Sequence, residues 1–229
     1  MCRIAQNGDL SNPEYFDHLK ILDQIFEALE RAVSLFCDAE KFKYAADIQR
    51  YLAKWNQSID NFEVAITQYK KASSYYLAEK METQYLSCLY QAALLMGSNS
   101  IQRYEDAARL FEILGESLIC NNLRKEVAKE CFFRSGLLSL ALGKTKFDIF
   151  DTFIKNFRSI DPTFAFSSHI HFLGNLKAII AGGKMDEFAD HLFYFCSIHE
   201  TEDWDLELFE KLKKLIRPLS DHTHQGSIE

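Results

Sequence analysis

Apolar residues recur every three to four positions along most of the chain, which is the spacing of one face of an α-helix. In residues 25–39, for example, Leu29, Val33 and Phe36 fall on one stripe. No segment of useful length alternates between apolar and polar residues as a half-buried strand would. The pattern therefore predicts an all-α fold with helices over residues 25–39, 44–55, 62–77, 85–96, 104–114, 127–142, 146–157, 164–180, 186–198 and 203–216.

A weak internal repeat predicts how these helices are arranged. Ala28, Ala65 and Ala107 each lie near the start of a helix and are separated by 37 and then 42 residues, close to the period of tetratricopeptide or HEAT-like repeats. Small residues there let neighbouring helices approach closely. Residues 1–143 are therefore expected to form stacked, tetratricopeptide-like helical hairpins in a right-handed solenoid, with Trp55 and Phe132 buried between hairpins.

The pattern of apolar residues changes after Gly143. We take Gly143 as a break between helices, and we predict further breaks at Ser58, residues 97–100, Gly115 and the Asn121–Asn122 pair. Phenylalanines become dense beyond this point, beginning with Phe147 and Phe150. A compact helical bundle over residues 144–219 is expected to close the solenoid, because a terminal repeat must cover its exposed face. Residues 220–229 are polar and are expected to form a flexible tail of the same continuous unit.

Composition narrows the class of protein. A formal net charge of −7 argues against a nucleic-acid partner. No stretch approaches 18 apolar residues, and the first twelve residues are too polar for a signal peptide. Six dispersed cysteines without CxxC pairs are typical of a reducing, cytoplasmic compartment.

The sequence gives little support for catalysis or for a cofactor. It contains neither a phosphate-binding glycine loop nor an acid pair in a polar setting, and Cys120 and Cys131 have no histidine base arranged beside them. His169 and His171 would point about 200° apart on a helix, so we interpret them as surface histidines and not as metal ligands. We therefore expect a protein that is not an enzyme and that binds neither metal nor cofactor.

The central segment carries a specific resemblance. Residues 122–137 read Asn-Leu-Arg-Lys-Glu-Val-Ala-Lys-Glu-Cys-Phe-Phe-Arg-Ser-Gly-Leu. This segment resembles the signature Tyr-Ser-Ala-Lys-Asp/Glu-Tyr-Phe-Phe-Lys-Ala-Gly/Ala-Leu of the alpha-type soluble attachment proteins (alpha-SNAPs). Residues 104–115 are similar to the family's Tyr-x-x-Ala-x-x-x-Tyr/Phe-Glu-x-x-Gly, and further matches continue in order at Tyr75-Tyr76, Asp161-Pro162 and Trp204. The resemblance covers roughly residues 25–215.

The resemblance implies a function as well as a fold. Proteins of this family form a twisted sheet of helical hairpins with a C-terminal bundle. They act as adaptors whose basic concave face lies along a SNARE complex of syntaxin-type and related helices, while the C-terminal end engages an AAA+ ATPase of the NSF type. By this resemblance Lys41, Lys125 and Lys129 would bind SNAREs, and Ile228 would occupy the place of a leucine that couples to the ATPase. Association with endomembranes would be peripheral, through these partners only.

Departures from the family weaken parts of this expectation. The chain begins about two hairpins late, so the family's N-terminal helices and apolar membrane-contacting loop are expected to be absent. Asp47 and Ser87 stand where lysines are usual, which makes the basic face thinner. Residues that are not acidic stand where the family has an acidic patch for the ATPase, namely Gly143, Ala178, Ala181 and Gly182.

Two alternatives remain beside the SNAP interpretation. Lys125 and Lys129 would ordinarily form a solvated helix face, with Lys129 paired to Glu126 or Glu130. The chain could also be a generic helical-repeat scaffold that binds peptide tails and has lost coupling to the ATPase. Such a peptide clamp would repeat asparagine and basic residues along its inner helices, and Lys54, Asn56 and Asn61 match that pattern poorly.

Overall fold

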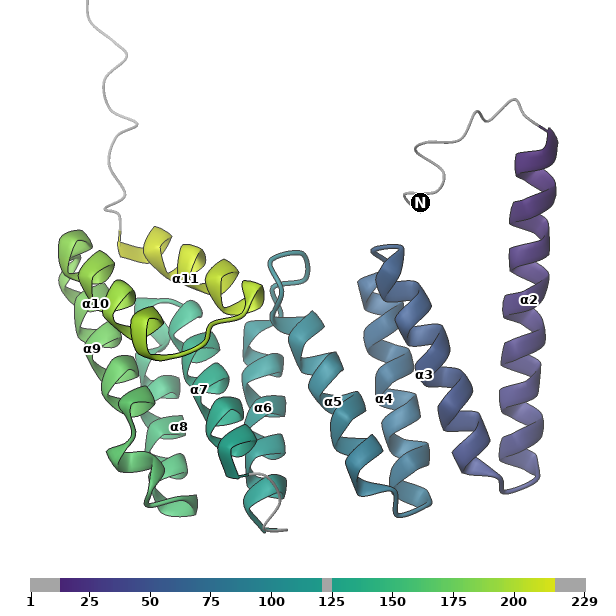
Figure 1. Cartoon of the computed structure of the whole chain (residues 1–229), viewed down its shortest axis with the longest axis horizontal. Helices are drawn as coiled ribbons and strands as arrows, with labels where there is room; N and C mark the ends of the chain where they lie inside the picture. Colours follow the sequence, from purple (N-terminus) through teal and green to yellow (C-terminus); the bar gives the residue numbers. More distant parts are fainter. Residues whose placement is uncertain (1–12, 121–124, 217–229) are drawn as a thin grey trace, which may run out of the picture. The chain divides into compact units, whose positions relative to one another are not determined.

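The fold follows the predicted helical periodicity. A computed structural model describes residues 13–120 and 125–216, with side chains from residue 20 onward except that of Ala165. The described residues form ten α-helices and two short 3₁₀-helices (η1 and η2), and none of them is in a strand (Figure 1). The all-α prediction is confirmed. The elements are α2 (Pro13–Asp38), α3 (Phe42–Ser58), α4 (Phe62–Ala78), α5 (Glu82–Gly97), α6 (Tyr104–Cys120), α7 (Lys125–Ala141), η1 (Lys144–Lys146), α8 (Phe147–Ile160), η2 (Phe164–Phe166), α9 (Ser168–Gly182), α10 (Met185–Ile198) and α11 (Asp203–Ile216).

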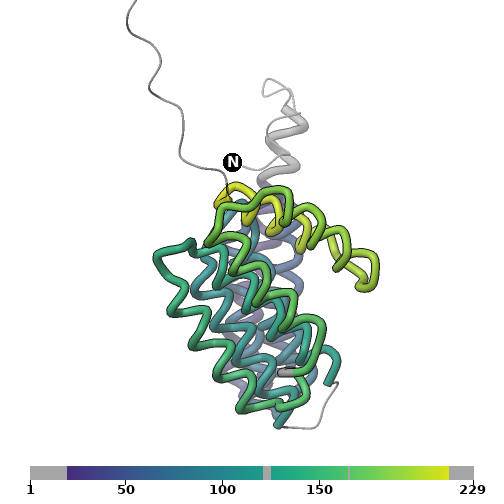
Figure 2. Tube along the Cα trace, turned by 90° about the vertical axis from the view of Figure 1, so that its left-hand side faces the viewer, coloured from purple at the N-terminus to yellow at the C-terminus, as the bar shows by residue number. Residues whose placement is uncertain are grey.

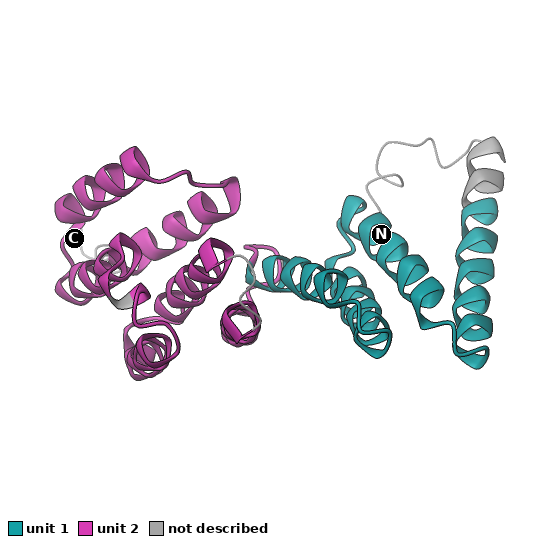
Figure 3. Cartoon of the chain, turned by 60° about the horizontal axis from the view of Figure 1, so that its bottom comes forward, with its two compact units in different colours: residues 1–97 teal, residues 98–229 magenta. Residues whose placement is uncertain are grey.

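The chain divides into two compact units, one up to Gly97 and one from Ser98 onward (Figure 3). Neither the boundary that we predict at residue 143 nor the continuous solenoid is tested by this division, and both stay predictions. The predicted tail, residues 220–229, lies outside the described residues. Among the described helices, none is long and apolar enough to cross a bilayer.

In the first unit α2 packs on α3, α3 on α4 and α4 on α5. The chain reverses between these helices through three turns of the same kind, in which Glu40, Asp60 and Lys80 adopt left-handed φ angles of 55°, 60° and 55°. In the last of them, the Met81 N–H donates to the Tyr76 carbonyl at 2.9 Å and the Lys80 N–H donates to the Leu77 carbonyl at 3.0 Å. These two bonds define a Schellman motif, which satisfies the carbonyls at the end of α4.

Buried alanines allow neighbouring helices to approach closely. This holds for two of the three alanines that the repeat predicts, but not for the third. Ala65 and Ala107 are each the fourth residue of a helix and are fully buried. Ala45 in α3 and Ala128 in α7 occupy the same position. Ala28 was assigned wrongly to this set, because it lies in the middle of α2 and is exposed.

The second unit is built around α7, which packs against α6, α8, α9 and α11. Gly115 lies inside α6 and does not break it, so our prediction of a break there is wrong. Its role is steric, since a Cβ at this position would overlap the ring of Phe132 on α7. Phe132 is fully buried as predicted, and it stacks on Phe157 with ring centroids 4.5 Å apart. Trp55, predicted to be buried in the first unit, is only half-buried and meets Phe26 edge-on.

Helices α9 to α11 complete this unit. The predicted helix over residues 164–180 is interrupted, because η2 ends at Phe166 and the Ser167 side chain caps a new helix by accepting a bond from the Ile170 N–H. Helix α11 runs across one end of the neighbouring helices of this unit (Figures 1 and 2) and packs on α7 and α9. The loop between α10 and α11 is thereby held beside α7.

Candidate functional site: charged surfaces on helices α3 and α7

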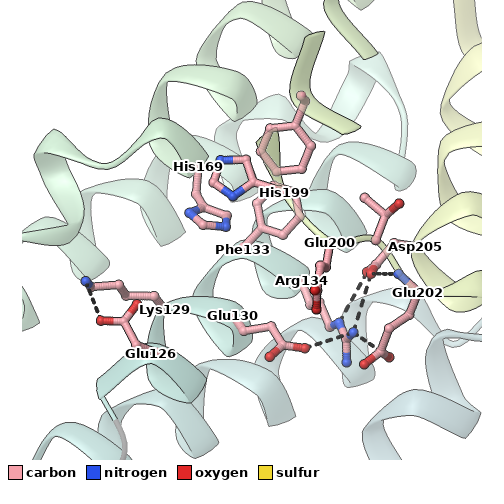
Figure 4. Close-up of a pocket in the computed structure, with 12 residues that line it drawn as sticks. Glu126, Lys129, Glu130, Phe133, Arg134, His169, His199, Glu200, Glu202 and Asp205 are labelled. Atoms are coloured by element: carbon pink, nitrogen blue, oxygen red, sulfur yellow. Dashed lines mark hydrogen bonds and ion pairs between the residues drawn. The ribbon is translucent and has the colours of Figure 1, made fainter. Parts of the chain in front are cut away.

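Two of the predicted lysines lie on one face of α7. Lys125 is its first residue and is exposed, and Lys129 follows one turn later. The Lys129 ammonium lies 3.0 Å from Glu126 Oε1 (Figure 4), so one of the two predicted ion pairs is present. The Glu126 side chain is 85% exposed, whereas that of Lys129 is only 24% exposed. Lys129 is therefore a less accessible cation than Lys125.

The other predicted site residues lie elsewhere. Lys41 belongs to the first unit, where it precedes α3 and is exposed. The structure thus brings Lys125 and Lys129 together on one helix of the second unit. Ile228 lies outside the described residues. The assignment of these four residues to partners stays a prediction.

The most prominent charged group in the second unit was not predicted. Arg134 on α7 has a side chain only 1% exposed, and its guanidinium contacts three carboxylates. Nη2 lies 2.9 Å from Glu130 Oε1 and 2.8 Å from Glu202 Oε2, and Nε lies 3.2 Å from Asp205 Oδ1. The guanidinium also lies 5.3 Å from the centre of the Trp204 ring. A buried charge is stable only when it is paired in this way, so Arg134 ties α7 to the start of α11.

A cavity of about 560 Å³ opens beside Arg134 (Figure 4). Its aromatic side is formed by Phe133, His169, Phe195 and His199, and the rings of His169 and His199 lie 4.5 Å apart. Burial, and then the nearby charges of His199 and Lys129, lower the pKa of His169 to about 4. His169 is therefore neutral at physiological pH and is half-buried, which corrects our interpretation of it as a surface residue. His171 is exposed, as predicted.

The cysteine beside Phe132 in α7, Cys131, is fully buried. Burial raises the pKa of the Cys131 thiol to about 12, so it is not a thiolate at neutral pH. Within residues 13–120 and 125–216, no three His, Cys, Asp or Glu side chains are grouped so as to hold a metal ion. The cavity has carboxylates at one side and aromatic rings at the other, and Nε2 of His199, which lines it, lies 2.7 Å from the Ser168 hydroxyl oxygen.

The four positions at which the resemblance implies acidic residues for the ATPase are uncharged, and all but Gly143 are exposed. Gly143 follows α7 in a left-handed conformation, and Ala178, Ala181 and Gly182 are exposed on the last turns of α9. A shallow cavity of about 470 Å³ lies beside Ala178, and Glu187 and Asp190 of α10 line it. This region of the second unit therefore keeps carboxylates, although on a different helix.

Buried alanine and aromatic packing between successive helices, with charged side chains displayed on the outer faces, defines a helical-repeat interaction protein. Comparison with known families makes the class specific. The sequence model of the family described as "Soluble NSF attachment protein, SNAP" matches residues 20–217, which include nearly all the described helices. The chain belongs to the SNAP family.

Individual relatives agree with this assignment. The chain is 25% identical over 194 residues to an alpha-soluble NSF attachment protein of Vitis vinifera, covering 85% of this chain and 66% of the relative. It is 26% identical over 196 residues to a probable vesicular-fusion protein sec17 homolog of Schizosaccharomyces pombe, covering 84% and 66%. A beta-soluble NSF attachment protein of Bos taurus is 22% identical over 195 residues, with 85% and 64% covered. The chain spans about two thirds of the length of these relatives.

Proposed function

We propose that this chain is a non-enzymatic adaptor that binds SNARE complexes and recruits the AAA+ ATPase that disassembles them, in vesicle fusion and intracellular protein transport. The observation that carries this proposal is the family match, which runs without interruption from residue 20 to residue 217. The names of the relatives, attachment proteins for NSF and vesicular-fusion proteins, point to the same process. Such an adaptor would work in the cytoplasm and reach endomembranes through its partners.

The lysines of α7 supply the contact chemistry for the SNARE side. Lys125, which is exposed, and Lys129, whose side chain is 24% exposed, lie one turn apart at the beginning of the helix, where they would face acidic side chains of a syntaxin-type helix. Contacts between exposed charges are screened within about 8 Å at physiological ionic strength. Binding should therefore weaken as salt is added, and its specificity would come from the alignment of several such contacts. Lys41 would add a further contact from the first unit.

The ATPase side would use the second unit and Ile228. The uncharged residues at Gly143, Ala178, Ala181 and Gly182 reduce the negative charge that the family presents there. Glu187 and Asp190 beside Ala178 are the carboxylates that remain near this surface. We therefore expect recruitment of the ATPase to be weaker than in relatives that retain the acidic patch. Complete loss of this coupling would leave a helical-repeat scaffold that binds SNAREs only.

Pull-down of the NSF-type ATPase by this chain, with and without an assembled SNARE bundle, tests the proposal. We expect the bundle to be captured by the chain and the ATPase to be captured only when the bundle is present. ATP hydrolysis by the ternary mixture should exceed that of the ATPase alone. Capture of the bundle without the ATPase would support the scaffold alternative, and failure to capture the bundle would reject the adaptor function.

A further inference from the structure

Helix α2 carries two apolar stripes, of which only one packs on α3. Phe26 and Val33 belong to the packed stripe, since Phe26 meets Trp55 edge-on and Val33 is buried. The other stripe lies about 100° around the helix from the first. The side of α2 that faces away from α3 is open (Figure 1). We call this second stripe the α2 stripe, and its members are Ile21, Ile25, Ala28, Ala32 and Leu35.

The α2 stripe is both exposed and regular. Ile21, Ile25 and Leu35 are 52%, 48% and 68% exposed. Single apolar residues on a surface need no explanation, but these five follow each other in alternating steps of four and three residues. This is the spacing of the core positions of a coiled coil. Ala28 and Ala32 in the middle of the stripe are small enough to let another helix approach closely.

Charged residues along one edge of the α2 stripe indicate which helix would fit. Lys20, Glu27, Arg31 and Asp38 are all exposed there, and their charges alternate in sign along the chain. Read from the other end, the same row has the opposite sign at each place. A second α2 running antiparallel would therefore set Lys20 near Asp38 and Glu27 near Arg31. In a parallel pair each charge would face its own kind, which is unfavourable.

We propose that the α2 stripe pairs with the α2 stripe of a second copy of this chain, in an antiparallel contact of two helices. Such a contact is two-fold symmetric, so Ala28 would lie near the axis and Ile21 of each copy near Leu35 of the other. Within one helix Arg31 lies 3.0 Å from Glu27, and both side chains are largely exposed. The contact would join this pair to the same pair on the second copy. The proposal goes beyond the adaptor function and does not depend on it.

The charge of α2 favours a protein partner over a lipid surface. Between residues 20 and 38, four acidic side chains accompany two basic ones. Helices that lie on membranes are instead rich in lysine and arginine on their polar face. A contact through one helix is at the small end of specific interfaces, so the dimer should form reversibly at micromolar concentration.

Sedimentation velocity over about 1 to 200 µM tests the proposal. The mass of the parent chain should rise with concentration from 26.5 kDa towards twice that value. Leu35→Glu puts a carboxylate into the α2 stripe and should weaken association by at least roughly tenfold. Leu77→Glu is the matched control, because Leu77 is a leucine of α4 in the same unit with a similar exposure of 56%. It should associate like the parent.

A charge exchange tests the antiparallel pairing through exposed side chains only. Arg31→Glu sets two carboxylates against each other and should weaken association by roughly tenfold, whereas Arg31→Glu combined with Glu27→Arg should restore it. A parent that stays monomeric throughout, or equal association of Leu35→Glu and Leu77→Glu, would overturn the proposal. So would a monomeric parent that floats with phosphatidylcholine vesicles and loses this binding in Leu35→Glu, because the stripe would then meet lipid. A double exchange that fails to restore association would overturn the antiparallel arrangement.

Discussion

Phe132 shows how one side chain joins several helices of the second unit. It is fully buried, its ring stacks on Phe157, and Phe164 meets it edge-on with centroids 5.7 Å apart. Phe132→Ala should lower the free energy of unfolding by about 3–5 kcal/mol, because the surrounding rings cannot collapse fully into the space left. Phe166→Ala, at a ring that is 85% exposed, is the control and should change it by less than about 0.5 kcal/mol. Chemical denaturation of both variants measures the difference, and equal midpoints would contradict the packing described.

The aromatic cluster around His169 predicts a dependence of stability on pH. The pKa of this histidine is lowered from 6.5 to about 4 in the folded protein, so the unfolded chain binds a proton first as the pH falls. The contribution of neutral His169 to the free energy of unfolding is fully present above pH 6.5. It decreases between pH 6.5 and about 4 and changes no further below pH 4. Allowing for partial exposure of the ring, the loss should be roughly 2 kcal/mol.

Substitution of His169 separates its contribution to the pH dependence of stability from the contributions of other titrating groups. His169→Gln should flatten the change in unfolding free energy between pH 6.5 and 4, whatever it does to stability at a single pH. His171→Gln, on an exposed position of the same helix, should keep the slope of the parent. A parent-like slope in His169→Gln would show that the folded protein does not disfavour protonation of this ring.

Single residues also show which structural features could be predicted from the sequence and which could not. The burial of Phe132 follows from the apolar periodicity, but the periodicity cannot tell a glycine that ends a helix from one that makes room for a ring, as Gly115 does. Arg134 was missed because its three carboxylate partners include two that lie about 70 residues away. The available signal was an arginine directly after two phenylalanines, in a helix that is buried on every side from Cys131 to Ala141.

At the scale of elements, Arg134 is the connection between α7 and α11. Arg134→Leu would leave the Asp205 carboxylate, which is 8% exposed, without its cation, and we expect a loss of about 3–5 kcal/mol in the free energy of unfolding. Arg134→Leu combined with Asp205→Asn should recover part of that loss, because the buried carboxylate is removed and the remaining partners, Glu130 and Glu202, are 40% and 64% exposed. Thermal melts of the single and double variants measure the recovery. A double variant that is less stable than Arg134→Leu would mean that Asp205 does not depend on this cation.

The turn between α4 and α5 offers a stabilising change. Lys80 has a φ of 55°, a left-handed conformation that costs a side-chain-bearing residue roughly 1–2 kcal/mol. Lys80→Gly removes that cost and adds some entropy to the unfolded chain, so a net gain of about 0.5–1 kcal/mol is expected. Lys80→Ala retains the Cβ and should give no such gain. Denaturant midpoints compare the two, and a loss of stability in Lys80→Gly would contradict the turn geometry.

The elements themselves were largely predictable, while the exact repeat was not. Ten predicted helical segments overlap the ten α-helices, because each helix buries a stripe with the 3.6-residue period. The true recurrence is an alanine at the fourth position of α3, α4, α6 and α7, which places one in both helices of the α3–α4 pair and of the α6–α7 pair. Ala28 matched the expected spacing by coincidence. The interruption at Ser167 was missed because apolar residues continue on both sides of its cap.

At the scale of the whole molecule, the resemblance carries more of the functional account than the physical pattern does. Periodicity indicates an interaction protein of stacked helices. The resemblance to SNAP proteins came from the segment at residues 122–137 and from weaker matches in order on both sides of it, and the family match then extended over residues 20–217. The roles of individual lysines could not be predicted from the pattern, because exposed lysines on a helix have no signature of a partner. Lys129 illustrates this, since its pair with Glu126 is what any solvated helix face would show.

The double variant Lys125→Glu and Lys129→Glu tests the central claim, that exposed cations of this chain bind an acidic SNARE bundle. It reverses four units of charge, and loss of the Lys129–Glu126 pair, in which Glu126 is 85% and Lys129 24% exposed, should cost about 1 kcal/mol at most, so the circular-dichroism spectrum and melting temperature should stay close to those of the parent. The measurement is a fluorescence-anisotropy titration of an assembled SNARE bundle with parent and variant at physiological salt. We predict that the parent binds and that the variant loses most of its affinity, by at least roughly tenfold. Binding of the parent and the folded variant with equal affinity would contradict the claim for this surface, and failure of the parent to bind would contradict it for the whole chain.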